Sequence, residues 1–325
     1  MTKTLERSSP HVNLTNEQIQ KCLDSLKNNI QVQECCLASS GLANTNYIVT
    51  LSNNEKVVLR IHSNENSDKG NKELKLAELL STVPQVPKIL YFQPTNGNDI
   101  SYSIIEFIPG TALPEINEKE NLDTVYFEIG EMLAKLKSIR FSANGLLGDN
   151  LEIIPIKTKH NEYHPVTNFV MDCLEDSNFA FRISLDITEA TKELLITNNS
   201  LLFATDEESH LVHGDFKIEN IMVKLSDDGN IRLSGALDWE HARSDSSYGD
   251  IATLFRGDYT KDSSHKLAFC KGFAKNGSTL IQDWDKACKL IDLVNICHFL
   301  CEKNDRPALF EIMTEHLKKT INYCK

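Results

Sequence analysis

The sequence predicts an α+β protein of two lobes: a small antiparallel β-sheet lobe with one inserted helix, and a larger, mainly helical lobe. Two observations lead to this prediction. Before residue 108, short segments rich in β-branched and aromatic residues alternate with turn-forming residues. After Pro109 and Gly110 this pattern ends, and long segments with helical periodicity follow. We therefore expect lobes over residues 1–107 and 108–325, joined by a hinge near 107–112, and 325 residues suffice for a sizeable core.

The first lobe begins with a predicted helix over residues 14–28. Thr15 is followed three residues later by Gln18, which is the pattern of an N-terminal capping box. Turn residues then separate three short β-rich segments, which predict three consecutive antiparallel strands. A segment of helical periodicity over 69–83 follows, and two further strands come after it. The five predicted strands cover residues 30–38, 46–52, 55–63, 87–94 and 101–108.

The second lobe is predicted to be helical almost throughout. Its first helix, over residues 119–139, is amphipathic. Residues 211–240 are the one segment with strand character, and they predict two short strands joined by a turn at DDGN. Further helices are predicted near residues 184–198, 247–256, 262–275, 280–302 and 306–323.

The composition narrows the class of protein. The net charge of −12 argues against nucleic-acid binding, because backbone phosphates would be repelled and no Lys/Arg block is present. An acidic surface suits a cationic small substrate, but it is equally a plain solubility feature. The first eighteen residues lack the apolar segment of a signal peptide, and no segment approaches the ~20 apolar residues of a membrane span.

The cysteines predict a reduced protein. There are nine of them, without the paired spacing that is typical of zinc sites. Cys297 and Cys301 lie in an apolar helical segment, where buried free thiols are expected. Together with the charge and the absence of apolar spans, this predicts a cytoplasmic protein without a nucleic-acid or membrane partner.

One short stretch, LVHGDFKIENIMV at 211–223, holds a dense group of polar residues between two apolar strands. A loop that is held at both ends presents its side chains in a fixed arrangement. Asp215, Asn220 and Asp238, the last at the exit of the following strand, carry the hard oxygen atoms that Mg²⁺ prefers. Lys217 adds a positive charge at the same place. A metal ion, a lysine and a spare carboxylate are what phosphoryl transfer requires.

Other interpretations of the same residues exist. His213 is expected to tie down the loop backbone, and Glu219 is expected to be solvated. A metal-dependent phosphohydrolase built from His213, Asp215, Asp238 and His241 is a second enzyme hypothesis, although it gives the β-rich lobe no role. A nucleotide-binding pseudokinase that serves as a scaffold is a third hypothesis, and the intact set of acids in the loop speaks against it.

The loop HGDFKIEN resembles the catalytic loop of the kinase superfamily, His-x-Asp-x-x-x-x-Asn. Its glycine and the later ALDWE resemble the aminoglycoside phosphotransferase and choline kinase branch, over about residues 33–256. The resemblance implies a protein kinase-like fold in which Asp215 orients the substrate hydroxyl and accepts its proton. It also implies that Lys217 reaches the γ-phosphate, that Asn220 and Asp238 bind Mg²⁺, and that ATP or GTP is the phosphoryl donor.

The resemblance extends to a phosphate-covering turn. SSGLANTNY at 39–47 lies between the first two predicted strands and resembles the turn of this family. Ser40 and Gly41 would let backbone N–H groups approach phosphate, and Asn44 matches a common family position.

The remaining nucleotide contacts are expected from the third strand, the inserted helix and the hinge. Arg60 stands where protein kinases place a lysine, and its guanidinium can pair with an α/β-phosphate and with a helix carboxylate. Glu73 is the expected carboxylate, with Glu78 as the second choice. At the hinge, backbone groups of Glu106 and Ile108 are expected to bind adenine.

The predicted function is ATP-dependent phosphoryl transfer to a hydroxyl of an aminoglycoside-like antibiotic or an amino- or hydroxyl-bearing metabolite. Gly214 stands where protein kinases regulated by activation-loop phosphorylation carry arginine. Only nine residues, 241–249, separate the DWE motif at 238–240 from Asp250. This leaves no room for a long activation segment and favours a constitutive small-molecule kinase, with Asp250 bracing the catalytic loop. A choline, ethanolamine or homoserine kinase is the metabolic alternative. Five acids are candidates to line a pocket for a cationic acceptor: Asp245, Asp258, Asp262, Asp283 and Glu302.

Overall fold

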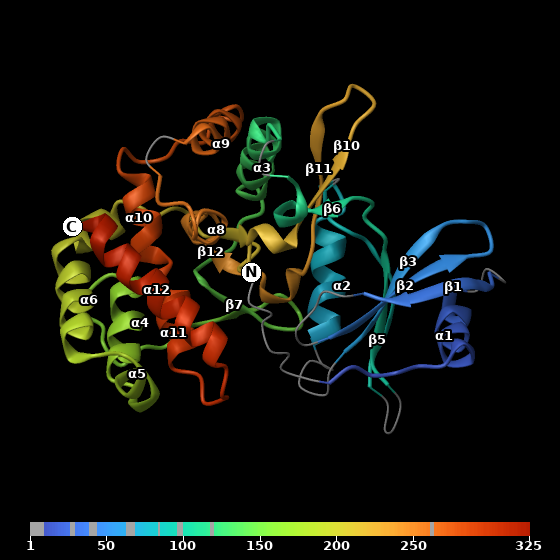
Figure 1. Cartoon of the computed structure of the whole chain (residues 1–325), viewed down its shortest axis with the longest axis horizontal. Helices are drawn as coiled ribbons and strands as arrows, with labels where there is room; N and C mark the ends of the chain where they lie inside the picture. Colours follow the sequence, from blue (N-terminus) through green and yellow to red (C-terminus); the bar gives the residue numbers. More distant parts are fainter. Residues whose placement is uncertain are drawn as a thin grey trace.

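The chain folds into a β-rich lobe and a larger, mainly helical lobe that lie side by side (Figure 1). The structure is a computed structural model, and it describes residues 10–26, 30–38, 44–62, 69–83, 85–95, 100–117, 120–260 and 263–325. The predicted fold class, an antiparallel sheet lobe followed by a mainly helical lobe, is confirmed.

The smaller lobe is a five-stranded antiparallel sheet in the order β1-β2-β3-β5-β4. Burial alternates strictly along β2, as expected for a strand with one face on a core. Tyr47, Val49 and Leu51 point into this core, together with residues of α1. All five predicted strands are present: β1 (Val32–Leu37), β2 (Thr45–Leu51), β3 (Lys56–Ile61), β4 (Ile89–Gln93) and β5 (Tyr102–Glu106).

The helix α1 (Asn16–Leu23) begins with the predicted capping box. The backbone N–H of Gln18 donates to the Thr15 hydroxyl at 3.3 Å, and the Thr15 N–H donates to the Gln18 side-chain oxygen at 2.8 Å. The helix is shorter than predicted, because the chain tightens into a 3₁₀ turn at Asp24–Leu26.

The helix α2 (Lys69–Leu79), inserted after β3 as predicted, connects the two lobes. Leu76 of the helix, with Leu80, Val83 and Val86 just beyond it, is buried in the same apolar cluster as residues of the larger lobe. The Lys72 ammonium also donates to the backbone oxygen of Glu240 at 3.0 Å. The helix α2, which stands between the lobes in Figure 1, therefore packs into the core of the larger lobe, whereas the sheet has a separate core with α1.

The larger lobe contains two small antiparallel sheets that support the polar loop. One has the order β11-β10-β6 and the other β8-β7-β12-β9. The predicted hairpin corresponds to β10 and β11, but the prediction of a single β-segment in this half was wrong. The additional strands have two or three residues each, too few for a detectable alternation. The strands are β6 (Thr111–Ala112), β7 (Gly145–Leu147), β8 (Ile153–Ile154), β9 (His210–Val212), β10 (Ile221–Leu225), β11 (Ile231–Ala236) and β12 (Arg243–Asp245).

The rest of this lobe is helical, and the predicted helices are present with different ends. The helix predicted over 280–302 is two helices, which separate at Asp292, a buried residue whose carboxylate binds Arg256. Three helices, α4, α5 and α7, were not predicted. The helices are α3 (Asp123–Leu136), α4 (Pro165–Leu174), α5 (Ser177–Arg182), α6 (Leu185–Thr197), α7 (Asn199–Phe203), α8 (Tyr248–Leu254), α9 (Ser264–Ala274), α10 (Trp284–Ile291), α11 (Leu293–Leu300) and α12 (Pro307–Cys324).

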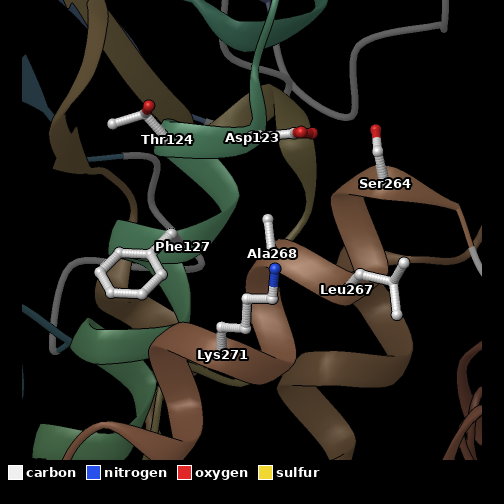
Figure 2. A pocket seen from close by; sticks show the side chains of 7 residues that line it. All are labelled: Asp123, Thr124, Phe127, Ser264, Leu267, Ala268 and Lys271. Atoms are coloured by element: carbon white, nitrogen blue, oxygen red, sulfur yellow. The ribbon is translucent and has the colours of Figure 1, made fainter.

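The helices α3 and α9 cross at two glycines. A Cβ on Gly130 would lie 2.3 Å from the Phe269 oxygen, and one on Gly272 would lie 1.9 Å from the Phe127 oxygen, so neither position can hold a larger residue without separating the helices. Beside this crossing, side chains of both helices line a shallow groove of about 370 Å³ (Figure 2). The groove includes Phe127, Leu267 and Lys271 and contains no residue of the polar loop.

Two further findings concern the cysteines and the search for membrane-spanning helices. All nine cysteines lie in the described residues and are free thiols. In the described ranges, no helix has the length and apolar character needed to cross a membrane.

Candidate active site

The polar loop runs from the end of β9 to the start of β10, and its backbone is held by Asp250 from α8. The N–H groups of His213 and Gly214 donate to the two carboxylate oxygens of Asp250, at 2.7 and 2.8 Å. Asp250 is 2% exposed, and burial raises its pKa, although His213 and the two backbone bonds oppose this shift. The prediction that Asp250 braces the loop is confirmed.

His213 is a structural residue, as predicted, and its hydrogen bonds define its tautomer. It is fully buried, and burial lowers its pKa. Its Nε2 lies 2.9 Å from the backbone oxygen of Leu237, which can only accept, so Nε2 carries a proton. Its Nδ1 accepts the backbone N–H of Asp215 at 3.3 Å and therefore carries none. The ring thus links the exit of β11 to the loop.

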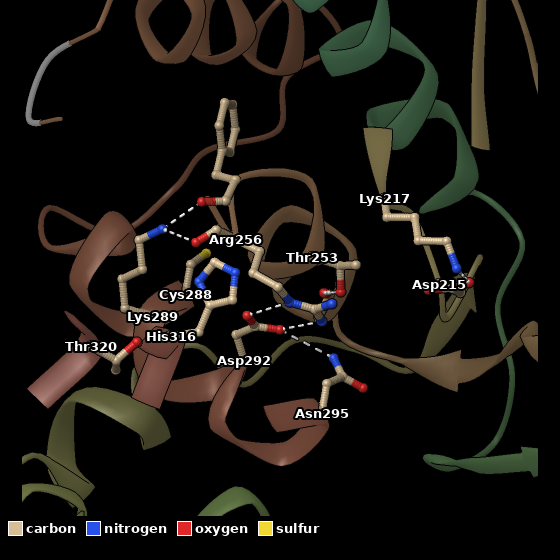
Figure 3. Close-up of polar contacts among 12 residues, drawn as sticks. Asp215, Lys217, Thr253, Arg256, Cys288, Lys289, Asp292, Asn295, His316 and Thr320 are labelled. Atoms are coloured by element: carbon tan, nitrogen blue, oxygen red, sulfur yellow. Dashed lines mark hydrogen bonds and ion pairs between the residues drawn. The ribbon is translucent and has the colours of Figure 1, made fainter. Parts of the chain in front are cut away.

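Three of the predicted site residues meet inside the loop. The Lys217 ammonium lies 2.5 Å from Oδ2 of Asp215, and Figure 3 shows the two side chains pointing toward one another. The Asn220 amide nitrogen donates to the Asp215 backbone oxygen at 2.9 Å and to its Oδ2 at 3.3 Å. The side chains of Asp215 and Lys217 are 23% and 34% exposed, so a substrate can reach them.

The fourth predicted residue of this group, Asp238, follows β11 in the left-handed conformation, with φ 71° and ψ 61°. Asparagine and aspartate tolerate this conformation better than most residues. Its carboxylate Oδ1 lies 3.5 Å from the Arg60 guanidinium of β3, across the boundary between the lobes. The two predicted groups of residues, one in each lobe, therefore meet at Asp238.

Arg60 has the predicted helix partner. Its guanidinium lies 3.4 Å from Oε2 of Glu73 in α2, so the choice of Glu73 over Glu78 is confirmed. Burial lowers the pKa of Arg60, but the surrounding carboxylates, Glu73 first, outweigh this effect and raise it. Burial also raises the pKa of Glu73, and its Oε1 has no hydrogen-bond partner in the part of the chain that the structure describes.

The structure describes only some of the other residues that were predicted to bind the nucleotide. Ser40 and Gly41 lie outside the described residues. Asn44 is buried immediately before β2, with 7% exposure. Glu106 ends β5, and Ile108 lies two residues further, against Gly235 of β11. The roles of these residues toward a nucleotide remain predictions.

The hydrolase hypothesis lacks the ligand cluster that it requires. Both ring nitrogens of His213 are used within the protein, and His241 is 52% exposed beside Glu240. In the described part of the chain, no group of three or more His, Cys, Asp or Glu side chains is arranged to hold a metal ion. A kinase site does not need such a cluster, because phosphate and water complete the shell of Mg²⁺.

The acids that were candidates for a cation pocket mostly have partners of their own. Asp245 pairs with Arg243 at 2.9 Å, and Glu302 pairs with Arg306 at 3.2 Å. Asp258 accepts from Ser263 at 2.9 Å. Asp283 precedes α10 without capping it through its side chain, and Asp262 lies outside the described residues.

Sequence reasoning missed several residues around the site. Asn46 of β2 accepts from the Arg60 guanidinium at 3.3 Å. Arg256, at the end of α8, binds Asp292 through two hydrogen bonds of 2.7 Å (Figure 3). Arg243 of β12 donates to the Gly214 oxygen at 3.4 Å. The contacts of Arg256 and Arg243 join residues 36 and 29 positions apart in the chain, so no local sequence pattern indicates them.

We expect the stability of the folded protein to fall at acidic pH because His62, just after β3, is buried. Burial, assisted by Arg60, lowers its pKa to about 4, so between pH 4 and 6.5 the unfolded chain binds a proton that the folded chain does not. The free energy of unfolding should therefore fall by about 2–3 kcal/mol on going from pH 7 to pH 4.5 from this residue alone. We expect His62→Gln to remove this part of the pH dependence in urea unfolding.

The exposed His241→Gln is the matched control and should leave the pH dependence unchanged. Four other histidines with lowered pKa contribute equally in all three proteins: His164, His210, His213 and His316. An equal pH dependence in His62→Gln and the unaltered protein would contradict the prediction.

Three solved structures have folds similar to this one. A GDP complex of aminoglycoside 2'-phosphotransferase-IIIa aligns over 95% of this chain and 99% of its own, with a TM-score of 0.66 and 15% identity. The choline kinase LicA from Streptococcus pneumoniae aligns over 94% and 98%, with a TM-score of 0.62 and 15% identity. A streptomycin–ATP complex of APH(2'')-IIa aligns over 96% and 99%, with a TM-score of 0.60 and 19% identity. At these identities the similarity shows the fold.

A comparison of the sequence with curated proteins found no match. Residues 34–287, most of the chain, match the phosphotransferase enzyme family, and the matched segment contains both the HGDFKIEN loop and ALDWE. The predicted resemblance and the predicted enzyme class, a phosphotransferase of the kinase type, are confirmed: this chain belongs to the phosphotransferase enzyme family.

Proposed function

We propose that this phosphotransferase moves the γ-phosphate of ATP or GTP to a hydroxyl group of a small molecule. The observation that carries the proposal is the meeting of two groups of residues. Asp215, Lys217 and Asn220 meet in the loop, and Asp238 reaches Arg60 and hence the sheet lobe.

In the proposed reaction, the Asp215 carboxylate orients the acceptor hydroxyl and takes its proton. The hydroxyl oxygen forms a bond to the γ-phosphorus while the bond from that phosphorus to the β–γ bridging oxygen breaks. Lys217, which pairs with Asp215 at 2.5 Å, can turn its charge to the transferring phosphoryl group when substrates bind.

The oxygen atoms of this site fit Mg²⁺. Both partners of the Asn220 amide nitrogen are acceptors, which fixes the amide orientation and directs its oxygen away from Asp215. Asp238 is 34% exposed, and its ion pair with Arg60 is long, at 3.5 Å. We propose that Asn220 and Asp238 hold the ion, which would neutralise phosphate charge during transfer.

The nucleotide is proposed to lie between the sheet and the loop. Arg60, fixed by Glu73 and Asn46, would reach the α/β-phosphates. The turn with Ser40, Gly41 and Asn44 would cover the phosphates, and the backbone of Glu106 and Ile108 would meet adenine. The boundary between residues 107 and 108 then lies at this nucleotide hinge.

Amino-bearing hydroxyl compounds are the acceptors we propose first, in a cytoplasmic setting. Solved proteins of this fold include a streptomycin complex and a choline kinase, and the net charge of −12 favours the approach of a cation. Sugars, and homoserine as a zwitterion, are the comparison compounds without net positive charge, because most candidate acids of a cation pocket are paired within the protein. No nucleic-acid or membrane partner is proposed.

A coupled ADP-release assay with aminoglycosides, choline, ethanolamine, homoserine and sugars tests the function. We expect nucleotide consumption that requires both an acceptor and Mg²⁺, with a phosphorylated acceptor detected by mass spectrometry. Nucleotide binding without transfer to any acceptor would favour the pseudokinase scaffold. Release of phosphate from an organic phosphate without nucleotide would favour the hydrolase.

A further inference from the structure

Five of the backbone N–H and C=O groups of residues 213–215 are held by hydrogen bonds. Asp250 accepts the N–H groups of His213 and Gly214, His213 accepts that of Asp215, and Asn220 donates to the Asp215 oxygen. The remaining group is the oxygen of Gly214, which belongs to the peptide unit that leads into Asp215. This oxygen accepts a hydrogen bond from the Arg243 guanidinium at 3.4 Å.

The Arg243 guanidinium lies in a slot between two glycines. A Cβ on Gly214 would lie 3.2 Å from Nη1 of Arg243, and a Cβ on Gly249 would lie 3.3 Å from its Nη2. Gly214 has φ +82°, a backbone conformation that residues with a side chain rarely adopt. A Cβ added there would also lie 2.1 Å from the His241 oxygen, so both the backbone conformation and the lack of space exclude a side chain. Two positions without side chains thus leave room for one guanidinium beside the loop.

Arg243 is oriented from its other side by Asp245. Its Nε donates to Oδ2 of Asp245 at 2.9 Å, while Oδ1 of Asp245 accepts the Ser246 N–H at 2.9 Å. Strand β12 itself pairs with β9, the strand that leads into the loop, through Arg243 and Val212. The positive charge of Arg243 also favours the ionised form of Asp250, which must accept two N–H bonds.

We propose that Arg243, held by Asp245, is a positioning residue that fixes the peptide between Gly214 and Asp215 and thereby aims the Asp215 carboxylate at the acceptor hydroxyl. The proposal rests on the proposed function of Asp215. It assigns Asp245 to orienting Arg243 rather than to binding a cationic substrate.

Gly249→Ala tests the slot without removing any hydrogen-bonding group. The new methyl group would press on Nη2 of Arg243, whereas alanine favours the helix α8 more than glycine does. Because Nη2 needs to move by only a few tenths of an ångström, we expect a small fall in kcat, about two- to threefold, with Tm unchanged or raised. Gly257→Ala is the matched control, because a Cβ at Gly257 would meet nothing within 4 Å.

Arg243→Met tests the guanidinium itself. We expect kcat to fall about 10–100-fold, with the Kd for ADP unchanged and kcat partly restored by guanidinium chloride at concentrations far below denaturing ones. Unchanged kcat in Arg243→Met, in protein whose acceptor-dependent turnover is established, would overturn the proposal. The proposal would also be overturned if both Arg243→Met and Gly249→Ala lost activity only in proportion to a lower folded fraction, and guanidinium did not restore it.

These outcomes separate the inference from the function on which it rests. If the unaltered protein transfers no phosphate to any acceptor of the panel, the proposed function fails first. If the unaltered protein is active and Gly249→Ala, Gly257→Ala and Arg243→Met all match it, the function stands and Arg243 has no positioning role.

Discussion

Replacing Asp215 by asparagine should lower kcat by at least about 10²–10⁴-fold, the usual contribution of a general base, while the nucleotide still binds. Asparagine keeps the shape of the side chain but cannot take a proton from the acceptor hydroxyl. The ion pair with Lys217 at 2.5 Å is also lost. Turnover in the coupled assay and the Kd for ADP by calorimetry measure the two parts of the prediction.

Glu219→Gln is the matched control for Asp215→Asn. It removes one carboxylate from the same loop, but Glu219 is exposed and has no proposed part in the reaction. We expect near-normal turnover. An Asp215→Asn protein with full activity would remove Asp215 from the mechanism, and equal losses in both variants would point to the charge of the loop rather than to its base.

Asp238→Asn should have the second largest effect, a fall in kcat of about 10²–10³-fold together with a higher Mg²⁺ requirement. A bound metal ion contributes several kcal/mol to stabilisation of the transition state, and each 1.36 kcal/mol is about a factor of ten. Asparagine is the right replacement because it tolerates the left-handed conformation at φ 71°, so the turn after β11 is preserved. Turnover is measured across a titration of Mg²⁺.

The control for Asp238→Asn is Asp227→Asn, which removes an exposed carboxylate from the turn of the same hairpin. It should leave both kcat and the Mg²⁺ titration unchanged. If Asp238→Asn behaves like this control at every Mg²⁺ concentration, Asp238 does not hold the ion. A binding measurement with Mn²⁺ and ADP gives a second readout that does not depend on turnover.

The parts of the site that could be predicted lie close together in the chain. Asp215, Lys217 and Asn220 share one loop, so their proximity follows from their spacing. The pairing of Arg60 with Glu73 could be predicted because a strand and the helix that follows it are neighbours. The sheet lobe was predictable because its strands are five to seven residues long and two of them, β2 and β3, alternate in burial.

The parts that could not be predicted depend on contacts between distant segments. The guanidinium that supports Gly214 comes from β12, which is three residues long and carries no periodic signal. The separation of α10 and α11 at Asp292 depends on Arg256, which is 36 residues earlier in the chain. Segment 141–205, with its short helices, showed one predicted helix where the structure has four.

The packing of α2 into the core of the larger lobe has a consequence for how the enzyme can open. Because Leu76 and Leu80 are buried with residues of the larger lobe, the sheet cannot swing away with α2 as one body without exposing apolar surface to water. Entry and exit of the nucleotide should therefore involve sliding of the strands over a stationary α2. The bond between Arg60 and Glu73, which spans that sliding surface, would report the opening.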